Sequence, residues 1–461
     1  MADTIEVGEK QTGGTLSAAE LNEIVQKTNA AIAELNQEKT NRANADDAIQ
    51  QISGVAIAEL NQEKTNRANA DDAIQQISAV NYPKDGSTLL PRTFGGLSQN
   101  YWWLKNVKLV LVADDLTENR VLCTFDNPSM PGDAVLNGSQ GQVMSKIPKI
   151  YYKEVFDENG ILVETATAPV KLNGYRCHEK FVRPDGSERD YIYIGAYEAS
   201  SSAGNVLQSV SGVVPLTGVD LATFRTRAFS RGSGWYPFDF YTQHLIQLLF
   251  YAVFADFNSQ TKLPGFTEAS SWNDAYKRNT GRSNVLTSMN GSIDAYLAGI
   301  DADLGAAGVT TGEKIANRFL FIENIFGHIW KMMDGVAFDG RVGQPNTVYA
   351  TADPAKFSSL EASILANYIN LNVVLPAAVN ENYMQSFQSL FLPKAHGGNS
   401  STYVTDYFWS YLDDASRNYL RLVLVGGALS YGAQAGLASR SSYYGLGHAY
   451  SLSGSRLCAA P

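Results

Sequence analysis

The C-terminal segment, residues 422–461, contains side chains that suit binding more than catalysis. It begins within a short apolar run, Leu420–Val425, and turns at Gly426–Gly427. Aromatic side chains then stand among Ser, Ala and Gly, at Tyr431, Tyr443, Tyr444, His448 and Tyr450. Tyr offers a large amphipathic contact area at low entropic cost, and Ser and Gly offer adaptable hydrogen bonding. Because this mixture suits strands and loops better than helix, we expect a binding surface built from strands and loops.

A second interpretation of the same segment is a Gly-rich β-hairpin region packed inside the core. The choice of side chains favours the surface, because the sequence from Gly426 onward contains no Lys, Glu, Met or Trp. Lys and Glu are among the commonest residues in average proteins. A single Gln, Gln434, is present. The segment therefore indicates a restricted set of side chains.

The histidines and cysteines form no catalytic pattern. The five histidines are scattered, with no H-E-x-x-H motif and no pair four residues apart that could hold zinc: His178, His244, His328, His396 and His448. The three cysteines are far apart and odd in number, which argues against a disulfide framework: Cys123, Cys177 and Cys458. G-x-S-x-G, Walker A and G-x-G-x-x-G motifs are also missing. We therefore expect no enzyme and no cofactor, with His244 and His328 as satisfied core residues.

Acidic residues give one weak candidate for a cation site. The pattern Asp301-x-Asp303-x-Gly305 resembles part of a calcium loop, but it lacks the full ligand series and the closing Glu of an EF-hand. No metal is expected, and calcium at this loop stays an open alternative. Glu323 and Asp334 lie in apolar surroundings and are expected to be buried structural residues.

Composition and charge bound the class of protein. A chain of 461 residues suggests two or three domains, and 44% hydrophobic residues provide a substantial core. The net charge of −10 and the lack of a Lys/Arg cluster argue against a nucleic-acid partner. No apolar run approaches the roughly 18 residues of a membrane span, and the N-terminus lacks signal-peptide order. We expect a globular protein made in a cytoplasm and not inserted into a membrane.

A perfect repeat marks the N-terminal part. Residues Ile32–Ser53 recur unchanged as Ile57–Ser78, an offset of 25 residues, which over seven helical turns lies between the coiled-coil and straight-helix periods. The predicted apolar seam contains Leu21, Ile24, Thr28, Ile32, Leu35, Ile49, Ile52, Ala56, Leu60, Ile74 and Ile77. One such helix buries little, so association is expected. The alternative is a solvated helix or one packed on the C-terminal body.

The remaining chain divides into a linker and a mixed domain. We expect a helical coiled-coil stalk over residues 1–80, a linker over 81–100 and a domain over 101–461. Strands are predicted at Val107–Ala113, Arg120–Phe125, Ile150–Phe156, Ile161–Thr165 and Tyr191–Ala196, with a tight turn at 184–186. A short amphipathic helix is predicted within 222–235, ending at Gly232–Gly234. Further helices are predicted over 240–260 and 317–335, and the one over 240–260 is apolar almost all round and should be buried.

Five segments carry a resemblance to a known family. They read GQVMSKIPKIYYK (141–153), HEKFVRPDGSERDYIYIGAYEA (178–199), RGSGW (231–235) with the following helix, FLFIENIFGHIWKMMDG (319–335), and the terminal GG…AGL…GSRLC. Their order resembles that of phage proteins with the formylglycine-generating-enzyme type of C-type lectin fold. The resemblance covers roughly residues 101–461 and implies an α+β fold with a C-terminal binding face. The paired catalytic cysteines of the enzymes are not reproduced, since the last third holds only Cys458.

The C-terminal segment is similar to the variable region of lectin-fold proteins diversified by retroelements. In those regions adenines of Asn-type codons are randomised, and such codons cannot yield Lys, Glu, Gln, Met or Trp. Residues 426–427, 435–437 and 454–458 would form the invariant frame, and Gln434 is either a frame residue or an exception to the codon argument. The implied receptor-binding residues between the frame pieces are Leu429, Ser430, Tyr431, Ser439, Arg440, Tyr443, Tyr444, Leu446, His448, Tyr450 and Leu452.

The resemblances imply a function in host attachment. The repeat resembles the shafts of phage tail fibres, which are usually trimeric. We therefore expect a homotrimeric tail-fibre protein of the virion, joined to other tail proteins through its N-terminus. Its partner would be a bacterial surface receptor, either glycan or protein. The alternative is a prophage or bacterial surface-displayed lectin-fold protein that binds a ligand and is not part of a virion.

Overall fold

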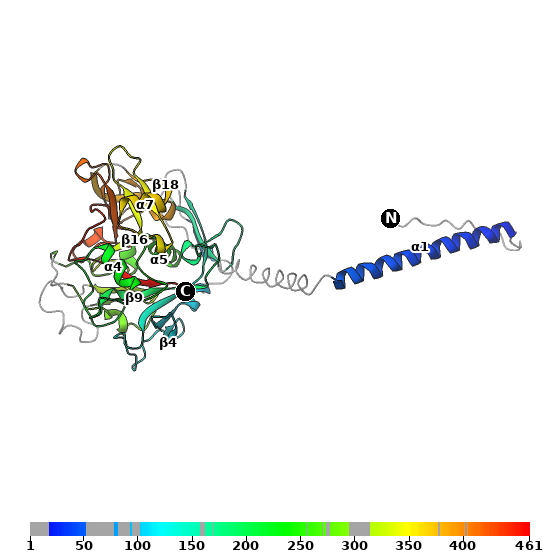
Figure 1. Ribbon diagram of the computed structural model, residues 1–461, viewed down its shortest axis with the longest axis horizontal. Coiled ribbons are helices and arrows are strands. Elements are labelled where there is room, and N and C mark those ends of the chain that lie inside the picture. Colours follow the sequence, from blue (N-terminus) through cyan, green and yellow to red (C-terminus); the bar gives the residue numbers. More distant parts are fainter. Residues whose placement is uncertain are drawn as a thin grey trace. The chain divides into compact units, whose positions relative to one another are not determined.

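The computed structural model describes most of the chain from residue 102 onward and one helix before it. The described residues are 18–51, 78–81, 93–94, 102–156, 162–168, 170–254, 256–269, 271–272, 277–294, 314–376, 379–400, 402 and 404–461. Internal contacts divide the chain into two units, Met1–Asn69 and Ala70–Pro461. Helices and strands are mixed (Figure 1), and one sheet curls into half a barrel. This agrees with an α+β protein at the coarse level.

The first unit contains the helix α1, Ala18–Gln51. Ion pairs four residues apart, such as Lys27 with Glu23 at 2.7 Å, stabilise its surface. The apolar side chains of Ile24, Ile32 and Leu35 are about half exposed in the single chain. The prediction of helix is confirmed for the first copy of the repeat as far as Gln51. The second copy, except its last residue, lies outside the described residues, and the coiled coil stays a prediction.

A six-stranded antiparallel sheet forms one part of the second unit. Its order is β12-β25-β9-β5-β3-β4. The strands are β3 (Lys108–Val112), β4 (Glu118–Thr124), β5 (Gln142–Pro148), β9 (Tyr191–Glu198), β12 (Trp235–Pro237) and β25 (Arg456–Ala459). The late strand β25 lies between β9 and β12, since Cys458 pairs with Ile194 on one side and with Tyr236 on the other. The C-terminal segment is thus an internal part of this sheet.

A larger sheet contains the rest of the C-terminal segment. Among the described residues it has nine strands in the order β18-β17-β16-β22-β23-β21-β19-β20, with β24 beside β16. The strands are β16 (Trp330–Asp339), β17 (Thr347–Ala350), β18 (Ile369–Val374), β19 (Val379–Gln388), β20 (Leu392–His396), β21 (Tyr407–Tyr411), β22 (Leu420–Val425), β23 (Arg440–Ser441) and β24 (Ser453–Gly454). The short strands β23 and β24 run parallel to β21 and β16 respectively.

Smaller sheets complete the second unit. One has the order β2-β1-β7-β6-β8, and another has the order β13-β14-β15. Their strands are β1 (Ser78–Asn81), β2 (Thr93–Phe94), β6 (Tyr151–Phe156), β7 (Leu162–Ala168), β8 (Arg176–Cys177), β13 (Gly291–Asp294), β14 (Lys314–Phe319) and β15 (Ile322–Glu323). A two-stranded pair joins β10 (Ser200–Ser201) to β11 (Leu207–Gln208). Most of the predicted linker, residues 81–100, lies outside the described residues.

Five α-helices lie among the described residues of the second unit: α3 (Trp102–Asn106), α4 (Leu221–Phe229), α5 (Phe240–Phe254), α6 (Ser259–Lys262) and α7 (Glu361–Asn367). Asp220 caps α4 by accepting a hydrogen bond from Thr223 N. The two helices predicted over 222–235 and 240–260 are confirmed, although each ends earlier, at Phe229 and Phe254. None of the described helices has the length and apolar character needed to cross a membrane.

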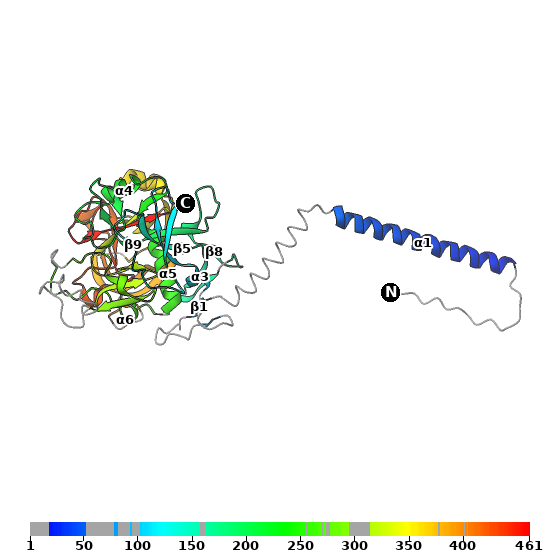
Figure 2. The ribbon, with the colours of Figure 1, turned by 90° about the horizontal axis from the view of Figure 1, so that it is seen from below.

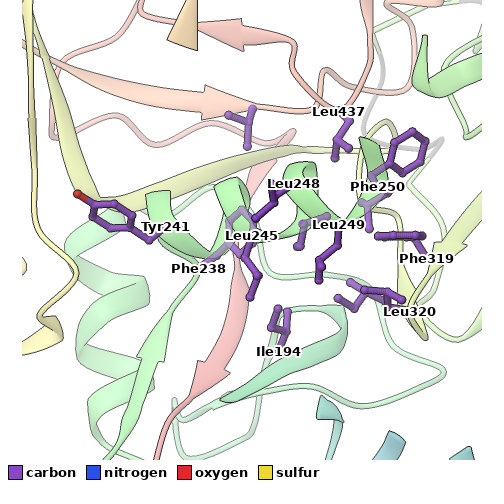
Figure 3. Close-up of a cluster of buried hydrophobic side chains, with 14 of the residues drawn as sticks. Ile194, Phe238, Tyr241, Leu245, Leu248, Leu249, Phe250, Phe319, Leu320 and Leu437 are labelled. Atoms are coloured by element: carbon purple, nitrogen blue, oxygen red, sulfur yellow. The ribbon is translucent and has the colours of Figure 1, made fainter. Parts of the chain in front are cut away.

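Helix α5 lies at the centre of the core. Figure 3 shows Leu437, from the C-terminal segment, on one side of α5 and Ile194, from β9, on the opposite side. Leu245, Leu248 and Leu249 of α5 are buried between them. Truncating a buried Leu of this kind to Ala typically costs about 2–5 kcal/mol of stability. The helix therefore packs between the C-terminal segment and the six-stranded sheet. Figure 2 shows α5 beside β5 and β9 of this sheet.

The helix predicted over 317–335 is wrong. This stretch forms β14, β15 and the start of β16. Leu320, Phe321, Asn324 and His328 have φ values between 51° and 62°, which no right-handed helix contains. The segment is buried on all sides, so its apolar residues are continuous and give no period that separates helix from strand.

The five predicted strands are confirmed. The runs at 107–113, 120–125, 150–156, 161–165 and 191–196 correspond to β3, β4, β6, β7 and β9, and Leu420–Val425 is β22. The tight turn at 184–186 is also present, closed by a hydrogen bond of 2.7 Å from Arg183 N to Ser187 O.

Candidate ligand-binding site

A pocket of about 390 Å³ lies where the C-terminal segment meets the large sheet. Its walls are mainly aromatic: Trp272, Trp330, Trp409, Tyr431, Tyr443, Tyr444 and Tyr450. Glu381, Leu424, Ser441 and Ser453 complete the lining. We call this set of residues the aromatic pocket. It is the candidate functional site of the chain.

Neighbouring strands position the walls of the aromatic pocket. Trp330, Trp409 and Ser453 belong to β16, β21 and β24, and Leu424 and Ser441 to β22 and β23. Successive side chains of a strand point to opposite faces. Leu424 accordingly packs in the cluster that contains Trp330, whereas its neighbours Val423 and Val425 join the main core around α5. One face of the sheet thus serves the pocket and the other serves the core.

Tyr431 holds the three tryptophans together. Its ring lies 5.3 Å from that of Trp272, 5.4 Å from that of Trp330 and 4.9 Å from that of Trp409, measured between centroids. The interplanar angles are 83°, 76° and 79°. Edge-to-face pairs of this kind contribute about 0.5–1.5 kcal/mol each beyond their burial. The cluster therefore gives the pocket a wall that is ordered before any ligand binds.

A second aromatic wall comes from residues 443–450. The rings of Tyr443 and Tyr444 lie 4.7 Å apart, and His448 stacks on Tyr444 at 3.5 Å. Burial lowers the pKa of His448 from 6.5 to about 4, so its imidazole is neutral at pH 7. Arg417 donates a hydrogen bond of 2.7 Å to the Tyr443 hydroxyl and pairs with Asp414 at 2.6 Å. These contacts fix the positions of the tyrosine rings.

Polar groups in the aromatic pocket are few. Among the described lining residues, only Glu381 of β19 is charged, and its carboxylate accepts a hydrogen bond from the Tyr411 hydroxyl. The indole N–H of Trp272 is buried and has no hydrogen-bond partner among the described residues. A buried donor without a partner is costly.

The eleven predicted contact residues occupy different environments. Four of them line the aromatic pocket: Tyr431, Tyr443, Tyr444 and Tyr450. Ser430, Leu446 and His448 are partly exposed without lining it. Leu429, Ser439, Arg440 and Leu452 are buried in the interior. The pocket thus contains the predicted tyrosines, while the remaining predicted residues divide between its surroundings and the core.

The interior positions of Leu429, Ser439, Arg440 and Leu452 contradict their prediction as contact residues. Leu429 and Leu452 pack in one apolar cluster, and Ser439 donates a hydrogen bond of 2.7 Å to Gln434 O. Arg440 alternates with Ser441 along β23, and its guanidinium points inward to donate hydrogen bonds to Phe391 O and Gln247 Oε1. Burial lowers the pKa of Arg440 to about 10. These four residues are structural.

The predicted frame residues hold the C-terminal segment against the core. Gly426 and Gly427 have φ values of 93° and 72°, and a β-carbon at position 427 would lie 2.7 Å from Ala435 Cβ. Arg456 is buried and donates hydrogen bonds to Gly195 O at 2.9 Å and Glu323 O at 2.6 Å. Burial and close backbone approach therefore determine which residue types fit at these positions.

A histidine pair elsewhere raises the question of a metal site. His178, Glu179 and His244 have ligand atoms within 4.8 Å of one another. The backbone N–H of Lys180 donates to His178 Nδ1, and His178 Nε2 lies 3.0 Å from His244 Nδ1. His244 Nε2 lies 2.6 Å from Glu154 Oε1. These hydrogen bonds use all four ring nitrogens of the two histidines. Burial also lowers the pKa of His178 well below its usual value. The pair is a satisfied hydrogen-bond chain in the core, as expected for His244.

The other singled-out polar residues are also structural. His328 lies outside any helix but is buried, and it contacts Glu198. Burial alone would raise the pKa of Glu198, but His328, Lys331 and Arg456 together lower it to about 2. Glu323 accepts hydrogen bonds from Gly281 N and Ser283 N, and Asp334 pairs with Arg225 at 2.7 Å. The candidate calcium loop at 301–305 lies outside the described residues.

The tryptophans and Glu381 of the aromatic pocket are not among the residues predicted from the sequence. Trp330 lies in the segment with the wrong helix prediction, and Trp272 and Glu381 lie in stretches without a recognisable motif. One signal was present: Tyr407, Trp409 and Tyr411 alternate along β21, which is the pattern of an aromatic face on a strand.

Comparison with known proteins adds no further constraint. No protein-family model matches the sequence, and no curated protein matches it. The geometry of the aromatic pocket therefore carries the functional argument.

Proposed function

We propose that this chain is a receptor-binding protein of a phage tail fibre, which attaches the virion to a bacterial surface receptor through the aromatic pocket. The observation that carries the proposal is the convergence of Tyr431, Tyr443, Tyr444 and Tyr450 with three tryptophans on one pocket. Aromatic residues enriched in one partly exposed site are typical of binding hot spots. The proposal includes a C-type lectin fold for residues 101–461 and a homotrimeric coiled-coil stalk over residues 1–80.

The division between buried frame and accessible wall supports a diversified binding face. The frame is held by Arg456 and by glycines that approach other backbone closely, so it tolerates little variation. Tyr431 and Tyr444 pack against a buried cluster, whereas Tyr443 is partly exposed and Tyr450 is 41% exposed. Side chains at positions 443 and 450 can therefore change with little effect on the core, which is what a variable receptor-binding surface requires.

The experiment that tests attachment removes two tyrosine rings from the second wall. We expect the Tyr443→Ala/Tyr444→Ala double variant of the full chain to bind host cells at least about tenfold more weakly, because aromatic hot spots each contribute about 2 kcal/mol or more. Flow cytometry with labelled protein measures the binding, and thermal unfolding checks the fold.

The matched control is Tyr419→Ala, since Tyr419 is 37% exposed and lies outside the aromatic pocket. Undiminished attachment by the double variant, or equal losses in the double variant and the control, would refute the proposed role of the pocket. A drop in thermal stability as large as the loss of binding would instead assign the two tyrosines to the core.

The alternative is a lectin-fold ligand-binding protein displayed on a bacterial or prophage-bearing cell and not part of a virion. Sequencing the gene in sibling phage particles separates the two. Substitutions confined to codons 428–452, beside a template repeat and a reverse-transcriptase gene, would support the virion protein. Substitutions spread evenly along the chain would remove the argument for diversification.

A further inference from the structure

We propose that the aromatic pocket recognises a small organic cation, such as a quaternary ammonium or methylated amine, on the receptor. This inference rests on the proposed function, because it names the chemical class of the group that the pocket binds. It follows from the directions of the ring planes, the charge of the lining and the size of the pocket.

The first observation is that the ring planes of the lining residues lie at steep angles to one another. Trp330 and Trp409 meet at 81°, and Tyr443 and Tyr444 meet at 67°. A sugar ring stacks best on one flat aromatic face. A compact, roughly spherical cation instead gains from several faces at once, because the negative face of each ring attracts the positive charge. Rings at steep angles to one another therefore favour the cation over a stacked sugar.

The second observation is the sign of the charge. Glu381 is the one charged group among the described lining residues, and no Lys or Arg is among them. The nearby Arg417 is paired with Asp414 and donates to the Tyr443 hydroxyl. A phosphate or carboxylate would meet only the repulsion of Glu381, whereas an ammonium group would be attracted by it. The net charge of −10 acts in the same direction.

The third observation is the size of the pocket. At about 390 Å³ the pocket is near the lower end of the range of about 300–1,000 Å³ found for small-molecule sites. It suits a head group with a short substituent. Choline combines these features and is a convenient probe.

The experiment titrates the full chain with choline and with 3,3-dimethylbutan-1-ol, its neutral carbon isostere, while tryptophan fluorescence reports binding. We expect choline to bind about tenfold or more tightly than the neutral alcohol, since only choline has cation–π attraction. Equal affinity for both probes, or no binding of choline, overturns the inference.

Two variants and a control locate the choline site. Glu381→Gln should weaken choline binding about threefold and leave the neutral alcohol unaffected. Trp409→Ala should abolish the fluorescence response to choline. The control Glu268→Gln removes another exposed carboxylate, outside the aromatic pocket, and should change neither affinity. Equal choline affinities of Glu381→Gln and Glu268→Gln would contradict the role of the Glu381 charge. This comparison holds even if Trp409→Ala does not fold.

Competition on host cells separates this inference from the proposed function. Inhibition of attachment by choline supports both. Attachment that resists choline but is inhibited by a neutral sugar retains the receptor-binding function and overturns the cation. Choline binding to the purified chain, without attachment to any host strain, retains the cation site and overturns the function.

Discussion

In the C-terminal segment, the face of the strand on which a residue lies decides whether its side chain lines the aromatic pocket or points into the core. Ser441 lines the aromatic pocket, and its neighbour Arg440 is buried with its guanidinium bonded to carbonyl and amide oxygens. The tyrosines could be predicted from residue type, because Tyr suits binding surfaces. The burial of Arg440 could not, because β23 is two residues long and too short to show a period.

His448 makes the stability of the segment depend on pH. Burial lowers its pKa from 6.5 to about 4, so the folded chain holds the neutral ring while the unfolded chain takes up a proton first. The stability that the chain has with a neutral His448 ring is fully present above about pH 6.5 and is lost as the pH falls through about 4. We expect the wild-type chain to lose stability relative to His448→Phe between about pH 7.5 and about pH 4.5.

Urea denaturation at the two pH values measures this difference. The variant His448→Phe keeps a ring that can stack on Tyr444 but cannot titrate, so it isolates the proton from the packing. Parallel pH profiles for the two proteins would show that His448 does not titrate as its burial implies.

At the scale of elements, the sequence predicted strands better than it predicted the 317–335 segment. The strands β3, β4, β9 and β22 have short runs of β-branched, aromatic and aliphatic residues. The apolar run of α5 is longer than these strands, which favours a buried helix. Residues 317–335 are buried throughout and turn through four non-glycine residues with positive φ. Such turns depend on tertiary contacts, including the hydrogen bonds of Glu323 and the burial of His328, which a local pattern does not contain.

Two glycines of the C-terminal segment should respond differently to substitution. Gly427→Ala places a β-carbon 2.7 Å from Ala435 Cβ at a φ of 72°, whereas a β-carbon at Gly447 meets nothing within 4 Å. We expect Gly427→Ala to lower the free energy of unfolding by about 2 kcal/mol or more, and Gly447→Ala to change it by less than about 0.5 kcal/mol. Urea unfolding of both variants makes the comparison, and equal effects would contradict the frame role of Gly427.

At the scale of the whole molecule, the helix α1 leaves apolar side chains unburied. Ile24 and Val25 are each 50% exposed in the single chain, but only Ile24 belongs to the predicted seam. The repeat and its spacing could be predicted from the sequence alone. The number of chains that associate could not, since the apolar spacing fixes a seam and leaves the count of partners open.

Because Ile24 belongs to the predicted seam and Val25 does not, the two positions give a matched pair of variants. We expect Ile24→Ser in the full chain to weaken self-association at least about tenfold, because each chain loses an apolar side chain at the interface, and Val25→Ser to leave it unchanged. Analytical ultracentrifugation over a range of concentrations measures the association. Identical behaviour of the two variants would favour a solvated helix without a seam, and a monomeric wild-type chain would exclude the trimer.

The place of β25 between β9 and β12 also governs when the protein can fold during its synthesis. A nascent chain that ends before residue 456 has the strands β9 and β12 but lacks the one that joins them. Unpaired strand edges of this kind aggregate readily and attract proteases. The ribosome must therefore translate past residues 428–452 before the six-stranded sheet can close, so a product interrupted within that stretch is expected to be degraded.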